Sequence, residues 1–466
     1  MWPATKTFFI AFVLCPIFRD IFRSYNIVDR PGLRKVHAYP IPRIGGIPLA
    51  IAYAVVLLSF PAYIGSYESP AWKFLPAAAM IFLTGLVDDV FHLGPIYKLA
   101  GEIVAASIAF WSGLRIEAIG SSSVPVWIGL PVTILWLVLS TNAFNLIDGL
   151  DGLCAGLAFI ATLTFFAVAL MQGNVVLEYA TLPFAGALLG FLCYNLNPAT
   201  MFLGDSGALL IGFLLGCFGI TAIQELPTLP GLVVPLLALS VPLTDALLSI
   251  VRRFLKGRPI FAADRGHLHH RLLDQGLSPR RAVFVLYVAA AIGAVFAILL
   301  NVASPGLKVV CIIASCLTAW VGIRWVRYAE FEVTGKLLFQ GEFRKAVQLR
   351  VRLEDLASEL RRSKTEDEWW NALVKAGRDA GWTLIQWTGG PWRREQLLRD
   401  QQPEWSFTVS LDVHQSVVNQ GAVNPGVENP CVQIGGVFQS SQPALDMLGT
   451  AAIIRSSYAA LRRELA

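Results

Sequence analysis

The sequence predicts an all-α polytopic membrane protein with about eleven transmembrane helices, followed by a small, soluble C-terminal α/β domain. Hydrophobic residues make up 55% of the 466-residue chain, and the mean hydropathy is +0.59. The apolar runs are long enough to cross a bilayer, and in lipid only helices or closed barrels satisfy the backbone polar groups. Near Arg324 the composition changes, and the rest of the chain is much richer in charge.

The membrane domain is expected to occupy residues 1–326. The first apolar run lacks a small-residue cleavage site and is followed by Arg19 and Arg23, so we interpret it as a retained span and not as a signal peptide. The predicted spans lie roughly at residues 4–22, 44–62, 74–87, 97–112, 125–141, 153–171, 180–194, 207–222, 230–251, 282–301 and 307–323.

Lysine and arginine gather in two loops, and these loops predict the orientation in the membrane. One follows the first span, and the other lies between the ninth and tenth spans. By the positive-inside rule both face the cytoplasm, which places the N-terminus outside and the C-terminal region inside. The net charge of +5 then reflects topology, and nothing in the sequence points to nucleic acid.

Residues 327–466 are expected to form the cytoplasmic α/β domain. The segment from Thr365 to Glu368 has the pattern of a capping box in front of a helix over 369–380. Alternating apolar segments predict strands at 383–387, 406–411 and 431–438, and an amphipathic helix is expected over about 443–465. No catalytic constellation stands out in this region of the sequence, and its role stays open.

Two carboxamides and two carboxylates stand together where the fifth predicted span ends. Asn142, Asn145, Asp148 and Asp151 follow one another at intervals of three residues, which places neighbours on adjacent helical turns. Such groups are costly beside a bilayer unless they line a polar cavity or bind a cation, and hard oxygen ligands suit Mg²⁺. A polar contact between helices is the alternative, but the density of Asn and Asp favours a site.

Two further acidic motifs stand at the ends of predicted spans. Asp88 and Asp89 end the third span, with Lys98 at the start of the fourth as a phosphate-binding cation. The pair forms either an interfacial salt-bridge anchor or a site for phosphate, metal or proton transfer. Asp205 lies between glycines just before the eighth span, where it is either a helix cap or a metal-binding carboxylate.

The two basic loops carry the remaining candidates. His267, His269 and His270 follow Arg265, but no cysteine or further close ligand completes a zinc site. Among arginines they resemble donors to a pyrophosphate, the alternative being a solvated basic loop. In the first loop, proline and glycine residues between the basic residues suggest a loop with a defined conformation. Anchoring by the positive-inside rule alone would also explain its charges. Its candidates are Arg34, Lys35, His37 and Arg43.

Taken together, these motifs resemble those of the polyprenyl-phosphate N-acetylhexosamine-1-phosphate transferases, the glycosyltransferase-4-like family of WecA, TagO and MraY. The matching strings run in family order over about residues 25–280. They are Arg-Lys-Val-His with Pro-Arg-Ile-Gly-Gly, Gly-Leu-Val-Asp-Asp, Asn-Ala-Phe-Asn-Leu-Ile-Asp-Gly-Leu-Asp-Gly-Leu, Phe-Leu-Gly-Asp-Ser-Gly and Asp-Arg-Gly-His-Leu-His-His-Arg-Leu.

The resemblance implies a reaction and roles for these residues. A lipid phosphate, undecaprenyl phosphate in bacteria, attacks the β-phosphate of a UDP-sugar and releases UMP, with Mg²⁺ required and Mn²⁺ as a second candidate. Asp205 and Asn145 are then the expected magnesium ligands, and Asp88, beside Asp89, is a base or a lipid-phosphate positioner. Asp148 and Asp151 would lie on the nucleotide side or support the site. The expected substrate-binding residues are Arg34, Lys35, His37, Arg43, Lys98, Asn142, Arg265, His267, His269 and His270.

The basic loop, the eleventh span and the inside tail resemble the WecA/TagO branch, so UDP-N-acetylglucosamine is the favoured donor. The alternatives are another UDP-N-acetylhexosamine (with MurNAc-pentapeptide, FucNAc or QuiNAc) or, in a different class, a transporter with intramembrane carboxylates. Transporters usually place such groups near the midplane, often with repeat symmetry, whereas here they cluster at one face. The expected setting is the bilayer of the bacterial plasma membrane, and a homodimer is one candidate assembly.

Overall fold

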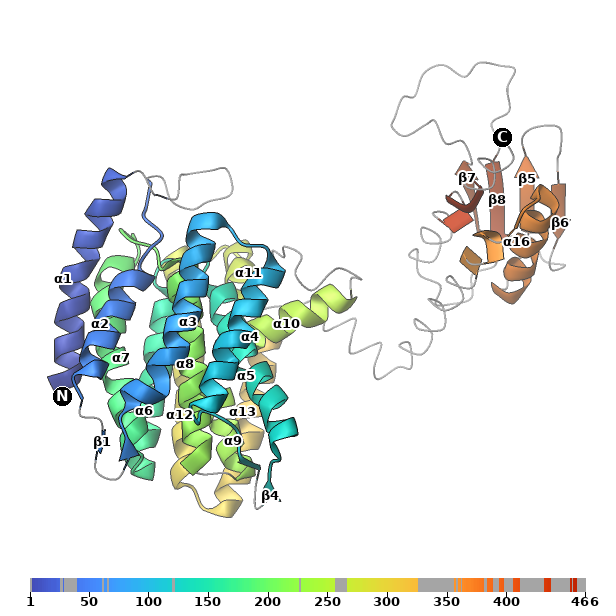
Figure 1. Ribbon diagram of the computed structural model, residues 1–466. Coiled ribbons are helices and arrows are strands. Elements are labelled where there is room, and N and C mark those ends of the chain that lie inside the picture. The colour runs from blue at the N-terminus through green and yellow to red at the C-terminus, as the bar shows by residue number, and fades with distance from the viewer. Residues whose placement is uncertain are drawn as a thin grey trace. The chain divides into compact units, whose positions relative to one another are not determined.

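The computed structural model divides the chain into two compact units, residues Met1–Tyr328 and Ala329–Ala466, which are described separately (Figure 1). The description covers residues 2–25, 28, 40–60, 63–64, 67–119, 122–225, 228–255 and 266–325 in the first unit. In the second it covers residues 356–357, 359–361, 363–380, 384–388, 394–397, 405–410, 431–436, 453–454 and 456–458.

The first unit is a bundle of helices with two short hairpins, and each of the eleven predicted apolar runs contains a helix. The hairpins pair β1 (Tyr63–Ile64) with β2 (Tyr67–Glu68) and β3 (Ala118–Ile119) with β4 (Ser122–Ser123). The helices are α1 (Trp2–Ser24), α2 (Gly46–Leu58), α3 (Pro70–Phe91), α4 (Pro95–Trp111), α5 (Val126–Ile147), α6 (Leu153–Gln172), α7 (Val175–Asn195), α8 (Gly204–Glu225), α9 (Leu229–Ala238), α10 (Ser240–Leu255), α11 (Leu268–Asp274), α12 (Pro279–Val302) and α13 (Pro305–Trp325).

The protein is a multi-pass membrane protein, but the prediction of eleven spans is not confirmed. Within the described residues, seven helices are long and apolar enough to cross a membrane, or eight if the bent pair α9–α10 is one span. The two helices of that pair meet at 82°, so the apolar run predicted as one span at 230–251 forms two helices with a sharp bend between them. Helix α2 is only 13 residues long and α4 only 17, which is short for a bilayer.

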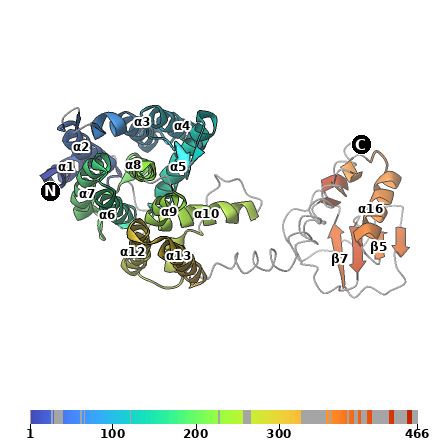
Figure 2. The ribbon, with the colours of Figure 1, turned by 90° about the horizontal axis from the view of Figure 1, so that it is seen from below.

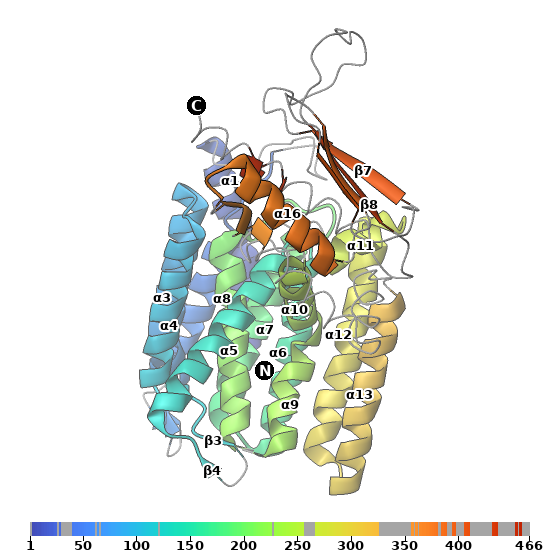
Figure 3. The same ribbon diagram turned by 90° about the vertical axis from the view of Figure 1, so that its right-hand side faces the viewer.

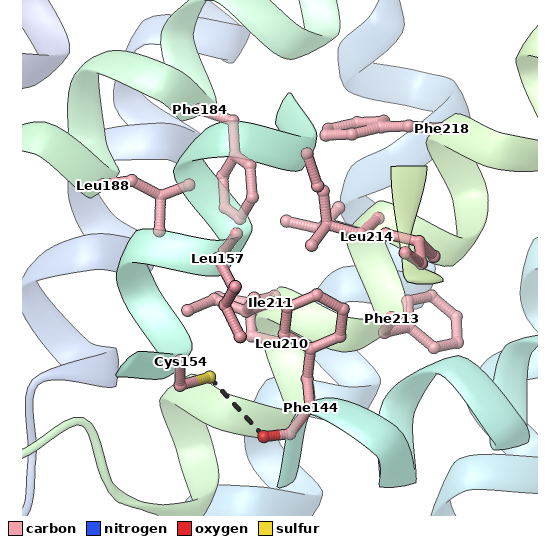
Figure 4. Packing of buried hydrophobic residues seen from close by; sticks show 14 of the residues in the cluster. Phe144, Cys154, Leu157, Phe184, Leu188, Leu210, Ile211, Phe213, Leu214 and Phe218 are labelled. Atoms are coloured by element: carbon pink, nitrogen blue, oxygen red, sulfur yellow. Dashed lines mark hydrogen bonds between the residues drawn. The ribbon is translucent and has the colours of Figure 1, made fainter. Parts of the chain in front are cut away.

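Helix α8 is the centre of the bundle. In the view along the bundle it lies inside a ring of other helices (Figure 2). The apolar stretch of α8 is buried along its whole length. Phe144 of α5, Leu157 of α6 and Phe184 of α7 pack with Leu210 and Leu214 of α8 in one hydrophobic cluster (Figure 4). The first residue of α8, Gly204, is therefore held at a fixed depth by packing on all sides.

The polar ends of several helices meet at one end of this bundle. Helices α3 and α5 run toward that end, and α4, α6 and α8 start from it, whereas the hairpins β1–β2 and β3–β4 lie at the opposite end (Figures 1 and 3). All three acidic motifs therefore come to the same end of the bundle. This agrees with the common side predicted for them from the sequence.

The second unit contains helix α16 (Glu366–Ala380) and a four-stranded antiparallel sheet. Its strand order is β6 (Arg394–Leu397), β5 (Leu384–Thr388), β8 (Cys431–Gly436) and β7 (Trp405–Ser410). Thr365 Oγ1 accepts the backbone N–H of Glu368 at 3.2 Å, so the predicted helix cap at Thr365 is present. The Glu368 carboxylate accepts the N–H of Lys364 at 2.8 Å and not that of Thr365, so the capping box is not complete, and the helix begins at Glu366 whereas the predicted start was 369. Strand β6 was not predicted, and most of the final helix expected at 443–465 lies outside the described residues.

Candidate active site at the polar end of the bundle

Lys98 lies at the centre of the polar cluster. Its Nζ is 2.9 Å from Oδ2 of Asp88, 3.3 Å from Oδ1 of Asn145 and 3.5 Å from Oδ2 of Asp205. These residues come from α4, α3, α5 and α8, so residues far apart in the sequence share one point. The Lys98 side chain is only 15% exposed, and three oxygen atoms therefore converge on one partly buried cation.

The turn between α3 and α4 sets the position of Asp88. Oδ1 of Asp88 accepts the backbone N–H of Leu93 at 2.8 Å, while Oδ2 accepts Lys98. His92 ends α3 in the left-handed conformation (φ 54°), and Pro95 begins α4. Both carboxylate oxygens of Asp88 thus have donors, and the side chain fixes the turn as well as the lysine.

Asp89 caps the N-terminus of α8. Its two oxygens accept the backbone N–H groups of Asp205 at 2.7 Å and Ser206 at 2.9 Å, which are free at a helix start. A carboxylate at this end also interacts favourably with the helix dipole. The geometry therefore gives Asp89 a positioning role toward Asp205, beside the catalytic role expected from the sequence.

Helix α3 approaches α8 closely because Gly85 has no side chain. A Cβ atom built on Gly85 would lie 2.5 Å from Cα of Ser206 and 2.7 Å from the carbonyl oxygen of Asp205. Gly85 stands one helical turn before Asp88. The spacing between the Asp88 and Asp205 carboxylates thus depends on direct backbone contact between the two helices.

Asn145 and Asn142 project from the last turns of α5. Asn145 donates from Nδ2 to Oδ1 of Asp205 at 2.6 Å. Asn142 donates to Glu102 of α4, whose side chain is buried one helical turn beyond Lys98. Glu102 was not singled out from the sequence, because a lone acid inside an apolar helix carries no motif.

The loop from Asp148 to Gly152 connects α5 to α6 beside this cluster. Burial raises the pKa of the Asp148 carboxyl to about 7, while Arg43 acts in the opposite direction. Asp151 instead accepts from Nδ2 of Asn197 at 2.8 Å and from the backbone N–H of Ala199 at 3.0 Å. Asp151 therefore ties this loop to the segment that leads into α8, which supports the site from outside.

Arg43 is the described member of the first basic loop. The segment around it pairs with the residues before α8: the backbone N–H of Phe202 donates to the Pro42 carbonyl at 2.9 Å, and that of Gly45 donates to the Phe202 carbonyl at 2.8 Å. The Arg43 side chain is exposed, and its charge acts on both Asp148 and Asp205. The exposed Arg43 side chain could therefore bind an anion beside Asp148 and Asp205.

The histidine motif lies at the start of α11, against the Asp148 loop. A Cβ atom on Gly149 would overlap the His269 ring, and burial lowers the pKa of His269 to about 4. His270 is exposed beside it, with ring centroids 4.3 Å apart. His267 pairs with Asp245 of α10 at 2.9 Å, a residue that the sequence reasoning missed because it stands inside an apolar run.

Part of the predicted site lies outside the described residues, namely Arg34, Lys35, His37 and Arg265. The other predicted residues lie around two neighbouring centres. One is the Lys98 cluster, which we define as Lys98 with Asp88, Asn145 and Asp205, and the other is the set of histidines that lie against the Asp148 loop. Their roles in binding or catalysis stay predictions.

The Lys98 cluster suits a hard divalent cation. Across the described part of the chain, no group of three or more His, Cys, Asp or Glu side chains forms a metal site. Mg²⁺ needs no such group, because it binds through one or two carboxylates, waters and substrate phosphates. Asp205 and Asn145 supply a carboxylate and an amide in direct contact, and the Lys98 ammonium shows that their oxygens accept a cation. The residues fit the ion.

Comparison with known proteins identifies the family of this chain. The profile described as glycosyl transferase family 4 matches residues 71–223. A protein of Bacillus subtilis, named a probable undecaprenyl-phosphate N-acetylglucosaminyl 1-phosphate transferase, is 35% identical over 300 residues, covering 63% of this chain and 82% of the relative. The chain belongs to glycosyl transferase family 4.

Other relatives of this family 4 member have similar names. A decaprenyl-phosphate N-acetylglucosaminephosphotransferase of Mycobacterium tuberculosis is 38% identical over 325 residues, covering 61% of this chain and 78% of the relative. An undecaprenyl-phosphate alpha-N-acetylglucosaminyl 1-phosphate transferase of Escherichia coli is 27% identical, covering 59% and 76%. The family match at 71–223 includes all four residues of the Lys98 cluster. The candidate site therefore lies within the part of the chain that matches the family.

Proposed function

We propose that this chain transfers N-acetylglucosamine-1-phosphate from UDP-N-acetylglucosamine to undecaprenyl phosphate, giving a sugar-pyrophosphoryl lipid and UMP. The observation that carries the proposal is the convergence of Asp88, Asn145 and Asp205 on Lys98 at one end of a membrane bundle. The names of the family relatives support the lipid and the sugar. We place the site on the cytoplasmic side of a bacterial plasma membrane, with the C-terminal unit, as a small α/β domain, on that side.

The reaction exchanges one phosphoanhydride bond for another. An oxygen of the lipid phosphate forms a bond to the β-phosphorus of the UDP-sugar, and the bond from that phosphorus to the bridging oxygen breaks. The electron pair leaves with that oxygen on UMP. Phosphoryl transfer of this kind depends mainly on positioning and on neutralising charge on phosphate oxygens.

The cluster provides for both needs. Asp205 and Asn145 would hold Mg²⁺, which, when bound, neutralises charge on the diphosphate oxygens. Lys98 then binds the lipid phosphate as a point charge. The histidines of α11 and Arg43 lie beside the Asp148 loop, where they would hold the diphosphate and the sugar.

Asp88 fits a positioning role better than that of a base. Both of its oxygens already accept donors, from Lys98 and from the Leu93 backbone. The acceptor phosphate is also largely ionised near neutral pH, since the second pKa of a phosphate monoester is about 6. We therefore expect Asp88 to orient Lys98. The pH–rate profile of Asp88→Asn should then keep the same acidic limb as that of the unmodified protein.

The transporter alternative is weaker because the polar residues that converge on Lys98 stand at helix ends at one end of the bundle, whereas transporters usually bind near the midplane. The test is UMP release by purified protein given undecaprenyl phosphate, Mg²⁺ and a panel of UDP-sugars. Release with UDP-N-acetylglucosamine, abolished by chelator and by Asp205→Ala, is expected. The matched control is Glu117→Gln, an exposed acid paired with Arg115, which should keep full activity. Folded protein that is silent with every donor would refute the proposal.

A further inference from the structure

Helix α10 presents a buried polar face toward the histidine motif. Asp245, Ser249 and Arg252 are spaced four and three residues apart, which places them on one side of the helix. Their exposed fractions are 0%, 0% and 2%. Burying a carboxylate and a guanidinium together is costly unless each is well paired, so this face has a specific purpose.

The partners of that face belong to the start of α11. Asp245 Oδ2 lies 2.9 Å from Nδ1 of His267, and its Oδ1 accepts the backbone N–H of Leu268 at 2.7 Å. The Ser249 hydroxyl lies 3.3 Å from the same ring nitrogen and accepts from Nη2 of Arg252 at 3.0 Å. The Asp245 carboxylate thus contacts both the imidazole ring of His267 and the backbone at the start of α11.

This contact decides which ring nitrogen of His267 carries a proton. A carboxylate accepts only, so Nδ1 of His267 must be the donor. The tautomer and the ring orientation are then fixed, and Nε2 is the atom left for another partner. Carboxylate–histidine pairs of this kind serve the same purpose in hydrolases and metal sites.

The orientation set at His267 extends to the candidate active site. The His267 ring lies nearly parallel to that of His269, with centroids 5.8 Å apart and an interplanar angle of 7°. The His269 ring packs directly on Gly149, next to Asp148. A buried carboxylate on α10 is therefore connected by contact to the loop beside the Lys98 cluster.

We propose that Asp245, assisted by Ser249, is a positioning residue that sets the His267 ring and docks α11 against the Asp148 loop, so that the histidines meet the donor diphosphate already oriented. The inference rests on the proposed function of the same site. Asp245 itself need not touch substrate, because its effect passes through His267.

The test is a double-mutant cycle on UMP release, with UDP-N-acetylglucosamine varied at saturating lipid. Asp245→Asn keeps the side-chain shape but faces the ring nitrogen with a donor or an uncharged acceptor. We expect kcat/KM for the UDP-sugar to fall between about 10-fold and 10⁴-fold, the range found when carboxylates that orient histidines are removed. In a His267→Asn background the same substitution should have little further effect.

Two comparisons separate positioning from a structural tie. Asp274→Asn removes the same charge from the exposed end of α11 and should leave kinetics unchanged. Ser249→Ala removes one hydrogen-bond partner of the ring without altering charge. It should lower kcat/KM by about 2- to 10-fold, as expected for one hydrogen bond, and it decides the question if Asp245→Asn does not fold.

Losses that multiply independently in the cycle would overturn the proposal, as would a Ser249→Ala variant with unaltered kinetics. So would an Asp245→Asn variant whose only change is a lower melting temperature in detergent. Failure of the proposed function gives a different pattern, because the unmodified protein would then release no UMP from any donor.

Discussion

The contact between α3 and α8 at Gly85 gives the sharpest prediction for the site. In Gly85→Ala the new methyl carbon would start 2.5 Å from Cα of Ser206, whereas ordinary contacts begin near 3.4 Å. The obstructing atoms are backbone, so no side chain can rotate away, and the two helices must separate by about 1 Å. Asp88 and Asp205 would move apart with them.

The expected cost is mainly kinetic. A displacement of about 1 Å at a catalytic site can cost about 100-fold in rate, so we expect kcat/KM for UMP release to fall by about that factor. Overpacking costs about 1–3 kcal/mol, and replacing a helical glycine by alanine returns about 1 kcal/mol. The free energy of unfolding should therefore fall by no more than about 2 kcal/mol.

The matched control is Gly322→Ala in α13, where a Cβ atom would meet nothing within 4 Å. Both variants are purified in the same detergent and compared by UMP release and by thermal unfolding. Gly322→Ala should keep full activity. If Gly85→Ala matched it in kcat/KM, the reasoning that backbone contact sets the carboxylate spacing would be wrong.

Four further outcomes are expected. Lys98→Gln should lower UMP release by at least about 100-fold, because the carboxylates of Asp88 and Asp205 lose their shared cation. Asp89→Ala, which frees two backbone N–H groups of α8, should cost about 0.5–2 kcal/mol of unfolding free energy, measured by chemical denaturation. Because the pKa of Asp148 is raised from 3.8 to about 7, its contribution to stability is full below pH 4 and is lost as pH rises through 7, so the melting temperature of Asp148→Asn should fall less over that interval. Treatment with EDTA should abolish UMP release and added Mg²⁺ should restore it, whereas recovery without any divalent ion would contradict a magnesium site.

The acidic motifs were predictable from the sequence because each stands at the end of an apolar run. The local sequence around Asp88, Asn145 and Asp205 is enough to predict their depth in the bundle, since the boundary of a span fixes the depth of the adjacent residue. The positive-inside rule then placed these boundaries on one side. Features set by depth in the membrane could therefore be predicted, and the polar end of the bundle is one of them.

Glu102 and Asp245 were missed for the opposite reason. Each lies within an apolar helix, where its purpose depends on a partner from another helix: Asn142 for the first and His267 for the second. Pairing across the bundle depends on helix rotation and crossing, which hydropathy does not encode. The 82° bend between α9 and α10 was missed likewise, since the run reads as one continuous apolar segment.

The enclosure of α8 has a consequence for biogenesis. The apolar stretch of α8 is fully buried, and it cannot reach that environment alone, because some of its neighbours, such as α9, are synthesised after it. Helices α3 and α5, and the capping aspartate Asp89, precede α8 in the chain, so α8 can pack against them once it is made, but its enclosure is complete only when α9 has been added. Assembly of the site is thus a late event in synthesis, and a product truncated after α8 would carry the three acidic motifs but lack the histidine motif and the helices that complete the enclosure.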